Sequence, residues 1–267
     1  MSGTRPGAYG GRSPAGDGRF LRHVPLGAAR DPRRLDIRAS VRDPLQRLQV
    51  RLAAQRSAAR VMAVLDLSAS MGFRGDNGKP SVMADLLCSL AMSVHRQGDL
   101  LGCVGSGERL HSAFTLAPGR ALGQVLELAD RLRRHPFVDR DCRSLPEAAA
   151  TVGATPSLVF LLSDLYLPVA ALARLLDLLA SHQVVPVVIW DELEVDGPKS
   201  TGLARLRDPE TGAERPWLLR AGWRHRLRAR RSELAQKLRS LCASRGTRPL
   251  FVTDGFAPDQ VSRYFYG

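Results

Sequence analysis

Five short apolar runs alternate with amphipathic stretches along most of this 267-residue chain. The apolar runs cover residues 61–67, 100–105, 158–162, 184–190 and 249–253. The amphipathic stretches, each long enough for two to four helical turns, cover residues 81–97, 120–134, 145–152, 169–182 and 232–244. Strands this apolar are buried on both faces. The alternation therefore predicts an α/β fold with a mostly parallel central sheet flanked by helices.

Three segments depart from this alternation. Residues 1–18 are rich in glycine and have little to bury, so we expect a flexible lead. Residues 19–60 are dense in arginine and contain an alternating stretch at 48–52, which predicts an N-terminal collar with an edge strand. Residues 61–267 then form the main domain, with a hairpin insertion at about 191–217 marked by prolines and the turn Asp208-Pro209-Glu210-Thr211-Gly212.

The chain carries 39 Lys plus Arg against 26 Asp plus Glu, a net charge of +13. Such a surface attracts anions, whether nucleic acid, a membrane face or an acidic protein partner, although an arginine-biased composition gives the same count. Arg215–Arg231 holds seven arginines with Trp217 and Trp223 among them, a pattern that can bind nucleic acid. We favour a simpler interpretation, in which the tryptophans pack under the hairpin and the arginines form a solvated face. Nucleic acid is therefore an alternative and not the expected partner.

No segment has the character of a membrane span or a secretory signal. The longest apolar region, residues 157–180, is interrupted by Asp164, Pro168, Arg174 and Asp177. The four cysteines lack the close spacing of a zinc knuckle or a redox dithiol. We therefore expect a cytoplasmic protein with reduced thiols and no membrane contact.

The run at residues 61–67 leads into the pattern Asp66-x-Ser68-x-Ser70. Open α/β sheets bind ligands at the carboxyl ends of their strands, which is where this pattern falls. A second apolar run ends in the same manner, in Ser163-Asp164. Carboxylate and hydroxyl oxygens suit Mg²⁺ or Mn²⁺ and not zinc, so two strand ends could converge on one such ion. The alternative is that Asp66 and the serines only cap a helix or close a turn.

The stretch Asp66-Leu67-Ser68-Ala69-Ser70-Met71 resembles the first loop of the metal-ion-dependent adhesion site of von Willebrand factor A domains. Ser163-Asp164 resembles the third loop. That family places a threonine in the second loop, just before a helix, and the matching position here is Ser144, with Cys142 and Thr151 as alternatives. The resemblance implies a von Willebrand factor A-like, Rossmann-type fold and a Mg²⁺ (or Mn²⁺) site. Its ligands would be Asp66, Ser68, Ser70, Ser144 and Asp164, completed by an Asp or Glu of a protein partner.

Two further segments make the resemblance more specific, because they match one particular family. Residues 30–40, Arg-Asp-Pro-Arg-Arg-Leu-Asp-Ile-Arg-Ala-Ser, and the acidic turn at 208–212 are similar to the bacterial domain of unknown function 58 family, over about residues 19–265. Some members have an N-terminal membrane hairpin, which this chain does not show. Others are encoded beside MoxR-type AAA+ ATPases. The resemblance therefore implies a partner of that class and a role in the assembly or maturation of a protein complex.

A metal-dependent phosphoester hydrolase is the enzymatic alternative. Aspartate nucleophiles of that chemistry need a second carboxylate two residues on, and Ser68 stands there instead. The chain has no Gly-x-Ser-x-Gly elbow, and Gly75–Pro80 lacks the length of a phosphate-binding loop. We therefore expect a metal-dependent protein-binding adaptor that is not an enzyme.

Overall fold

A computed structural model describes residues 10–11, 20–28, 32–53, 55–56, 58–75, 78–196, 202–207, 212–219, 222–253 and 255–266. The chain divides into two units, residues 1–59 and 60–267. The expected flexible lead, apart from Gly10 and Gly11, and the expected turn at 208–211 lie outside the described residues.

The N-terminal unit is built on two small antiparallel pairings. Strand β2 (Phe20–Pro25) pairs with β3 (Gln49–Ala53), which covers the segment where the sequence predicts an edge strand. Strand β1 (Gly10–Gly11) pairs with β4 (Gln55–Arg56). Helix α1 (Ile37–Arg42) begins at Asp36, whose Oδ1 accepts a hydrogen bond from the Ala39 N–H at 3.0 Å and so caps the first turn. Two short 3-10 turns, at Leu26–Ala28 and Pro32–Arg34, complete this unit.

The second unit contains a six-stranded sheet with the strand order β12-β9-β8-β5-β6-β7. Its strands are β5 (Arg60–Asp66), β6 (Leu100–Ser106), β7 (Leu110–Gly119), β8 (Leu158–Ser163), β9 (Gln183–Ile189) and β12 (Leu250–Val252). All neighbours pair in parallel except β6 and β7. The α/β fold with a mostly parallel sheet is therefore confirmed. The chain passes from β5 to β6 on one side and later to β8 on the other, so its connections diverge at the carboxyl end of β5.

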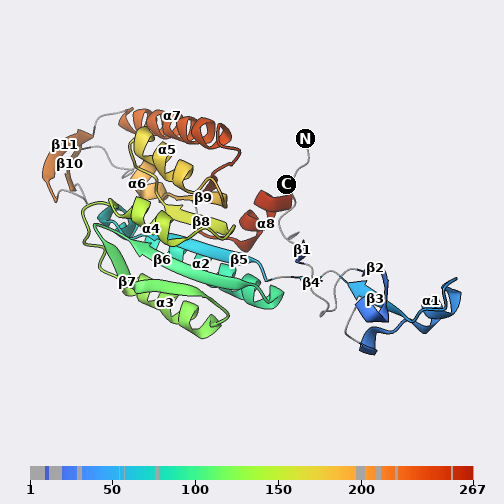
Figure 1. Cartoon of the computed structure of the whole chain (residues 1–267). Helices are drawn as coiled ribbons and strands as arrows, with labels where there is room; N and C mark the ends of the chain where they lie inside the picture. Colours follow the sequence, from blue (N-terminus) through green and yellow to red (C-terminus); the bar gives the residue numbers. More distant parts are fainter. Residues whose placement is uncertain are drawn as a thin grey trace. The chain divides into compact units, whose positions relative to one another are not determined.

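Helices cover both faces of this sheet (Figure 1). On one face lie α2 (Lys79–Gln97), α3 (Leu122–Arg134) and α8 (Pro258–Tyr266); on the other lie α4 (Leu145–Thr151), α5 (Val169–Leu178) and α7 (Trp223–Ala243). Strand β5 serves both cores, because Val61, Ala63 and Leu65 face the first set and Met62 and Val64 the second. Among the described residues, no helix is long and apolar enough to span a membrane.

Strand β7 and helix α8 are among the elements that the structure adds to those expected from the sequence, and helix α7 is longer than expected. Strand β7 is a half-exposed edge strand and so has no continuous apolar run to reveal it. Helix α8 follows directly on β12 at the end of the chain. Helix α7 begins at Trp223 and not at Ser232, because arginine favours helix even where no apolar stripe is present.

The segment after β9 contains three short elements. Helix α6 (Glu192–Asp196) comes first, and β10 (Gly202–Arg207) then pairs antiparallel with β11 (Glu214–Leu219). Trp217 on β11 is 54% exposed, so the expectation that it packs under the hairpin is wrong. Because β11 ends at Leu219 and α7 starts at Trp223, the arginine-rich segment 215–231 is divided between a strand and a helix.

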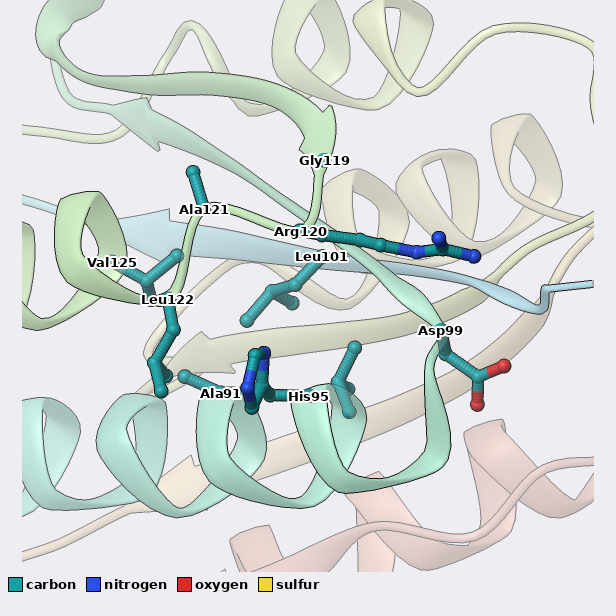
Figure 2. Close-up of a pocket in the computed structure, with 10 residues that line it drawn as sticks. Ala91, His95, Asp99, Leu101, Gly119, Arg120, Ala121, Leu122 and Val125 are labelled. Atoms are coloured by element: carbon teal, nitrogen blue, oxygen red, sulfur yellow. The ribbon is translucent and has the colours of Figure 1, made fainter.

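A small cavity lies between α2, α3 and the ends of β6 and β7 (Figure 2). Ala91, His95, Leu101 and Val125 are among the residues that line it, and its volume is about 10 Å³. A space of this size holds at most one water molecule. It is therefore not a ligand site.

Candidate metal centre

The five residues expected to bind metal lie at the carboxyl ends of adjacent strands. Asp66 is the last residue of β5, and Ser68 and Ser70 follow it, Ser70 within the 3-10 turn Ala69–Gly72. Asp164 comes directly after β8, which pairs with β5. Ser144 immediately precedes α4. Each of the five is at most 6% exposed.

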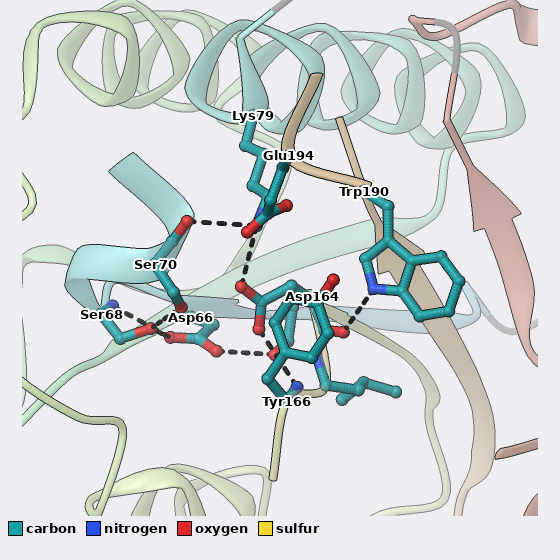
Figure 3. A network of polar contacts seen from close by, with 10 residues as sticks. Asp66, Ser68, Ser70, Lys79, Asp164, Tyr166, Trp190 and Glu194 are labelled. Atoms are coloured by element: carbon teal, nitrogen blue, oxygen red, sulfur yellow. Dashed lines mark hydrogen bonds and ion pairs between the residues drawn. The ribbon is translucent and has the colours of Figure 1, made fainter. Parts of the chain in front are cut away.

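Asp66 is held by hydroxyl groups from two loops (Figure 3). Its Oδ1 accepts hydrogen bonds from the backbone N–H of Ser68 at 2.9 Å and from Ser68 Oγ at 2.7 Å. Its Oδ2 accepts one from Ser163 Oγ at 2.6 Å. The Oγ atoms of Ser68 and Ser70 lie 3.2 Å apart, so the first loop gathers its oxygens on one side of the carboxylate. No cationic side chain of the described residues bonds to Asp66.

The second loop brings Ser144 to the same end of the sheet. Its Oγ lies 2.8 Å from Ser106 Oγ, and Ser106 is the residue of β6 that pairs with Asp66. By contrast, the hydroxyl of Thr151 donates to the carbonyl of Ala148 within α4, at 2.7 Å. The structure therefore places Ser144, and not Thr151, beside the strand ends. The hydroxyl of Ser106 is a further oxygen that the sequence pattern did not single out.

Lys79, the first residue of α2, enters the site as a buried cation (Figure 3). Its Nζ donates hydrogen bonds to the backbone carbonyl of Ser70 at 3.1 Å, to Asp164 Oδ2 at 3.0 Å and to Glu194 Oε1 at 2.8 Å. Glu194 belongs to α6. With three acceptors for its three N–H groups, the ammonium is fully satisfied.

Sequence reasoning missed both Lys79 and Glu194. It considered Lys79 only as part of a phosphate-binding loop, and Glu194 gave no signal. The available clue was composition: the chain has three lysines, Lys79, Lys199 and Lys237, among its 39 basic residues. A lysine at the start of an apolar helix in so arginine-rich a chain indicates a position that arginine does not fit.

The carboxylates of this cluster outnumber its cations. Burial, and then the nearby charge of Asp164, raise the pKa of Asp66 to about 6, although the hydrogen bonds from Ser163 and Ser68 oppose them. Burial alone would lower the pKa of Lys79, but Asp164 and Glu194 outweigh it and keep the lysine charged. Burial also raises the pKa of Glu194, although Lys79 opposes this. Lys79 therefore compensates Asp164 and Glu194 in part and leaves Asp66 without a counter-charge.

These residues fit a hard divalent cation. The three loops present carboxylate and hydroxyl oxygens only, which is the donor set that Mg²⁺ and Mn²⁺ prefer. In addition, Asp66 is buried without a positive charge bonded to it among the described residues, and a bound cation would supply that charge. Asp164 is shared: its Oδ2 is bonded to Lys79, while its Oδ1 accepts the backbone N–H of Tyr166 at 3.2 Å. A cation at this site would therefore share Asp164 with the lysine.

The third loop is fixed by aromatic residues and holds a strained backbone. Leu165, next to Asp164, has a φ of 54°, in the left-handed region that residues other than glycine seldom adopt. The indole N–H of Trp190 donates to the backbone carbonyl of Asp164 at 2.9 Å, and the ring of Tyr166 stacks on that of Trp190 with centroids 6.1 Å apart. These contacts hold the Asp164 loop in one position against the ends of β8 and β9.

The sequence matches a family model described as "Protein of unknown function DUF58" over residues 28–239. The chain belongs to the DUF58 family. This confirms the family resemblance seen in the sequence, and the fold predicted from it is confirmed above. No curated protein matches this DUF58 chain.

Several solved structures are similar to this chain at low sequence identity. An aerotolerance-related membrane protein from Bacteroides fragilis NCTC 9343, carrying multiple mutations to serines, is 12% identical with a TM-score of 0.50, over 78% of this chain and 98% of that one. BatB from Bacteroides thetaiotaomicron is 14% identical with a TM-score of 0.48, over 79% and 100%. The SpRpn10 VWA domain is 12% identical with a TM-score of 0.41, over 78% and 95%. At these identities the likeness concerns the fold alone, and the metal ligands of this DUF58 chain stay a prediction.

Proposed function

We propose that this DUF58 chain is a protein-binding domain whose site holds Mg²⁺ or Mn²⁺ and receives a carboxylate of its partner. The ligands are Asp66, Ser68, Ser70, Ser144 and Asp164. When bound, the ion supplies the missing positive charge and an open coordination position for an Asp or Glu side chain of the partner. The role is adaptor-like and includes no catalytic step.

One observation carries this proposal. Asp66 is 1% exposed, has both carboxylate oxygens hydrogen-bonded to serines, and has no cation among its bonding partners in the described residues. A buried carboxylate without a counter-charge is costly, and it persists where a ligand repays that cost. The hydroxyl groups of Ser68 and Ser70, 3.2 Å apart beside it, add neutral oxygens of the right kind.

The chain's own residues prepare the site. Ser163 and the Ser68 backbone orient Asp66, while Lys79 and the Tyr166 N–H orient Asp164. Because the hydroxyl ligands are neutral and Lys79 already offsets part of the acidic charge, an ion here keeps a net positive charge toward the outside. That charge is what attracts a carboxylate from another protein.

The family resemblance adds a candidate partner. Because the resemblance implies that some DUF58 relatives are encoded beside MoxR-type AAA+ ATPases, we propose an ATPase of this class as the partner, in the cytoplasm and in the assembly or maturation of a protein complex. The net charge of +13 assists association with an acidic partner surface.

Binding to a purified MoxR-type ATPase from the same organism tests the proposal. The ATPase is immobilised without nucleotide, and the DUF58 chain is added with Mg²⁺, with Mn²⁺ or with EDTA. Binding is expected with either ion and is lost in EDTA or on Asp66→Asn. Thr151→Ala, whose hydroxyl is occupied inside α4, serves as the matched control and binds normally. Equal binding in EDTA and in Mg²⁺ would contradict the metal-dependent mode.

A further inference from the structure

A second polar site lies beside the candidate metal centre, under helix α7. It is a cleft of about 510 Å³ between that helix and the carboxyl ends of β9 and β12. Arg228, Arg231, Ser232 and Arg239 line it from one face of α7, because they are spaced three, four and eleven residues from the first. Trp190 and Phe251 form its opposite wall. The cleft is thus basic on one side and aromatic on the other.

Two of these arginines are held in place by aromatic rings. The Cζ of Arg231 lies 5.3 Å from the ring centroid of Trp190, and the Cζ of Arg239 lies 4.7 Å from that of Phe251. Neither guanidinium forms an ion pair with a carboxylate of the described residues. A guanidinium stacked on a ring keeps the N–H donors at its edge available for an anion and loses little side-chain freedom on binding.

The charges that face the cleft leave it positive. Arg228, Arg231 and Arg239 contribute three positive charges and Glu192 one negative charge. The hydroxyl groups of Ser232 and Thr253 add neutral hydrogen-bonding groups. This composition suits a ligand with more than one carboxylate, since paired guanidiniums bind carboxylates through charge-assisted hydrogen bonds.

The ring faces distinguish a peptide from a nucleic acid. A single-stranded nucleic acid is bound by stacking its bases on open aromatic rings. Here Arg231 lies over the ring of Trp190, Tyr166 stacks on the same ring, and the residue is only 3% exposed. Phe251 is covered by Arg239. The cleft therefore offers charge but no stacking platform.

We infer that this cleft is a docking site for an acidic segment of a partner protein, which places carboxylates against Arg231 and Arg239. This goes beyond the proposed function because the cleft needs no metal. Trp190 forms the boundary between the two sites, since its indole N–H bonds to Asp164 while its ring meets Arg231. An acidic segment bound in the cleft would therefore lie close to the candidate metal centre, because Trp190 contacts residues of both sites.

Fluorescence anisotropy with a labelled hexaglutamate peptide tests the inference. The full chain is used in EDTA at near-physiological salt, so that the result does not depend on the metal centre. The double variant Arg231→Ala/Arg239→Ala is expected to lower the affinity about tenfold or more. The matched control is Arg96→Ala/Arg120→Ala, which removes the same charge from exposed positions in the last turn of α2 and just after β7 and is expected to change the affinity less than about twofold.

A variant that is expected to bind more tightly keeps the test informative if the double variant Arg231→Ala/Arg239→Ala misfolds. Glu192→Gln removes the acidic charge that the described residues contribute to the cleft and is expected to tighten hexaglutamate binding. Equal losses in the two double variants would show that only diffuse charge matters and would overturn the inference. So would an unchanged or weakened affinity in Glu192→Gln. Tighter binding of a labelled dodecathymidine strand, lost in Arg231→Ala/Arg239→Ala, would assign the cleft to nucleic acid instead.

Discussion

Lys79 Nζ lies 3.0 Å from Asp164 Oδ2, and the two side chains are 0% and 3% exposed. This ion pair joins the start of α2 to the loop after β8. Because Lys79 Nζ also donates to the backbone carbonyl of Ser70, the lysine ties together the first and third loops of the candidate metal centre. Glu194 joins it at 2.7 Å from the same ammonium. The central cation of the site is therefore part of the chain, and a bound metal would be a second one.

The first prediction concerns this buried ion pair. Lys79→Met removes the cation and leaves the buried Asp164 and the partly buried Glu194 without a counter-charge, so we expect the free energy of unfolding to fall by about 3–5 kcal/mol. Urea denaturation measures it. Lys237→Met is the matched control, because Lys237 pairs with Glu233 on the exposed surface of α7 and its loss is expected to change the unfolding free energy far less. Similar losses in both variants would show that the burial of Lys79 contributes nothing specific.

The second prediction identifies the second-loop ligand. Ser144→Ala removes the hydroxyl that lies beside Ser106 at the strand ends, and we expect Mg²⁺ affinity to fall about tenfold or more. Isothermal titration calorimetry measures the affinity. Thr151→Ala also removes one hydroxyl, at the other end of α4, but leaves the affinity unchanged, since that group is bonded to the Ala148 carbonyl. The reverse result would assign the position to Thr151.

The third prediction concerns the pH dependence of stability. Burial, and then the neighbouring His111, lower the pKa of His135, although Asp139 opposes them, and His135 Nε2 is buried without a partner among the described residues. The folded pKa is below the unfolded value of about 6.5, so the stabilising contribution is present above that pH and is lost as the pH falls through the folded pKa.

His135→Phe tests this directly. The ring packs edge-on against Phe114 and Phe137, with centroids 4.9 and 4.8 Å away, so phenylalanine fits the site without a titrating group. We expect the variant to lose less unfolding free energy than the wild type between pH 7 and pH 5, as measured by urea denaturation. His225→Gln, at an exposed position, is the control. Parallel curves for His135→Phe and the wild type would rule out His135 as the source.

The fourth prediction concerns the close approach of the first loop to the end of β9. A Cβ added at Gly75 would lie 2.1 Å from Asp191 Oδ1, and Asp191 is buried and caps the start of α6 through the Leu193 N–H at 2.9 Å. Gly75→Ala must therefore shift one of the two segments, at a cost of about 1–3 kcal/mol. Thermal unfolding measures it.

Gly123→Ala is the comparison for that variant. Gly123 lies in α3 and has no atom within 4 Å of an added Cβ, so alanine there should stabilise the protein by about 0.5–1 kcal/mol. If both alanines raise the melting temperature, the contact at Gly75 is looser than the structure indicates.

The sequence reveals the fold where burial is complete on both faces of a strand. The runs at 61–67 and 158–162 are continuous and apolar because β5 and β8 lie in the middle of the sheet. Strand β7 escapes notice because it is an edge strand with exposed residues. The first turns of α7 could not be predicted from an apolar pattern, because they bury almost no side chains. The buried residues of that helix, Ala235, Leu238 and Cys242, all lie in its second half.

The residues of the candidate metal centre also divide into those that a local sequence pattern reveals and those that it does not. Asp66, Ser68 and Ser70 stand within five residues of one another, so a local pattern reveals them. Lys79 and Glu194 are 115 residues apart, and they meet only because α6 follows β9 at the edge where α2 begins. Contacts of this kind depend on the folded sheet, and a single sequence carries no local sign of them.

Isothermal titration of Mg²⁺ into the wild-type chain and into Asp66→Asn, at pH 7.5 and with folding checked by circular dichroism, tests the central claim most directly. The account predicts saturable binding of one ion to the wild type and none to the variant, while both stay folded. Absence of binding to the wild type, or equal binding to the folded Asp66→Asn protein, would contradict it. In the first case Lys79 would be the only cation that this site holds.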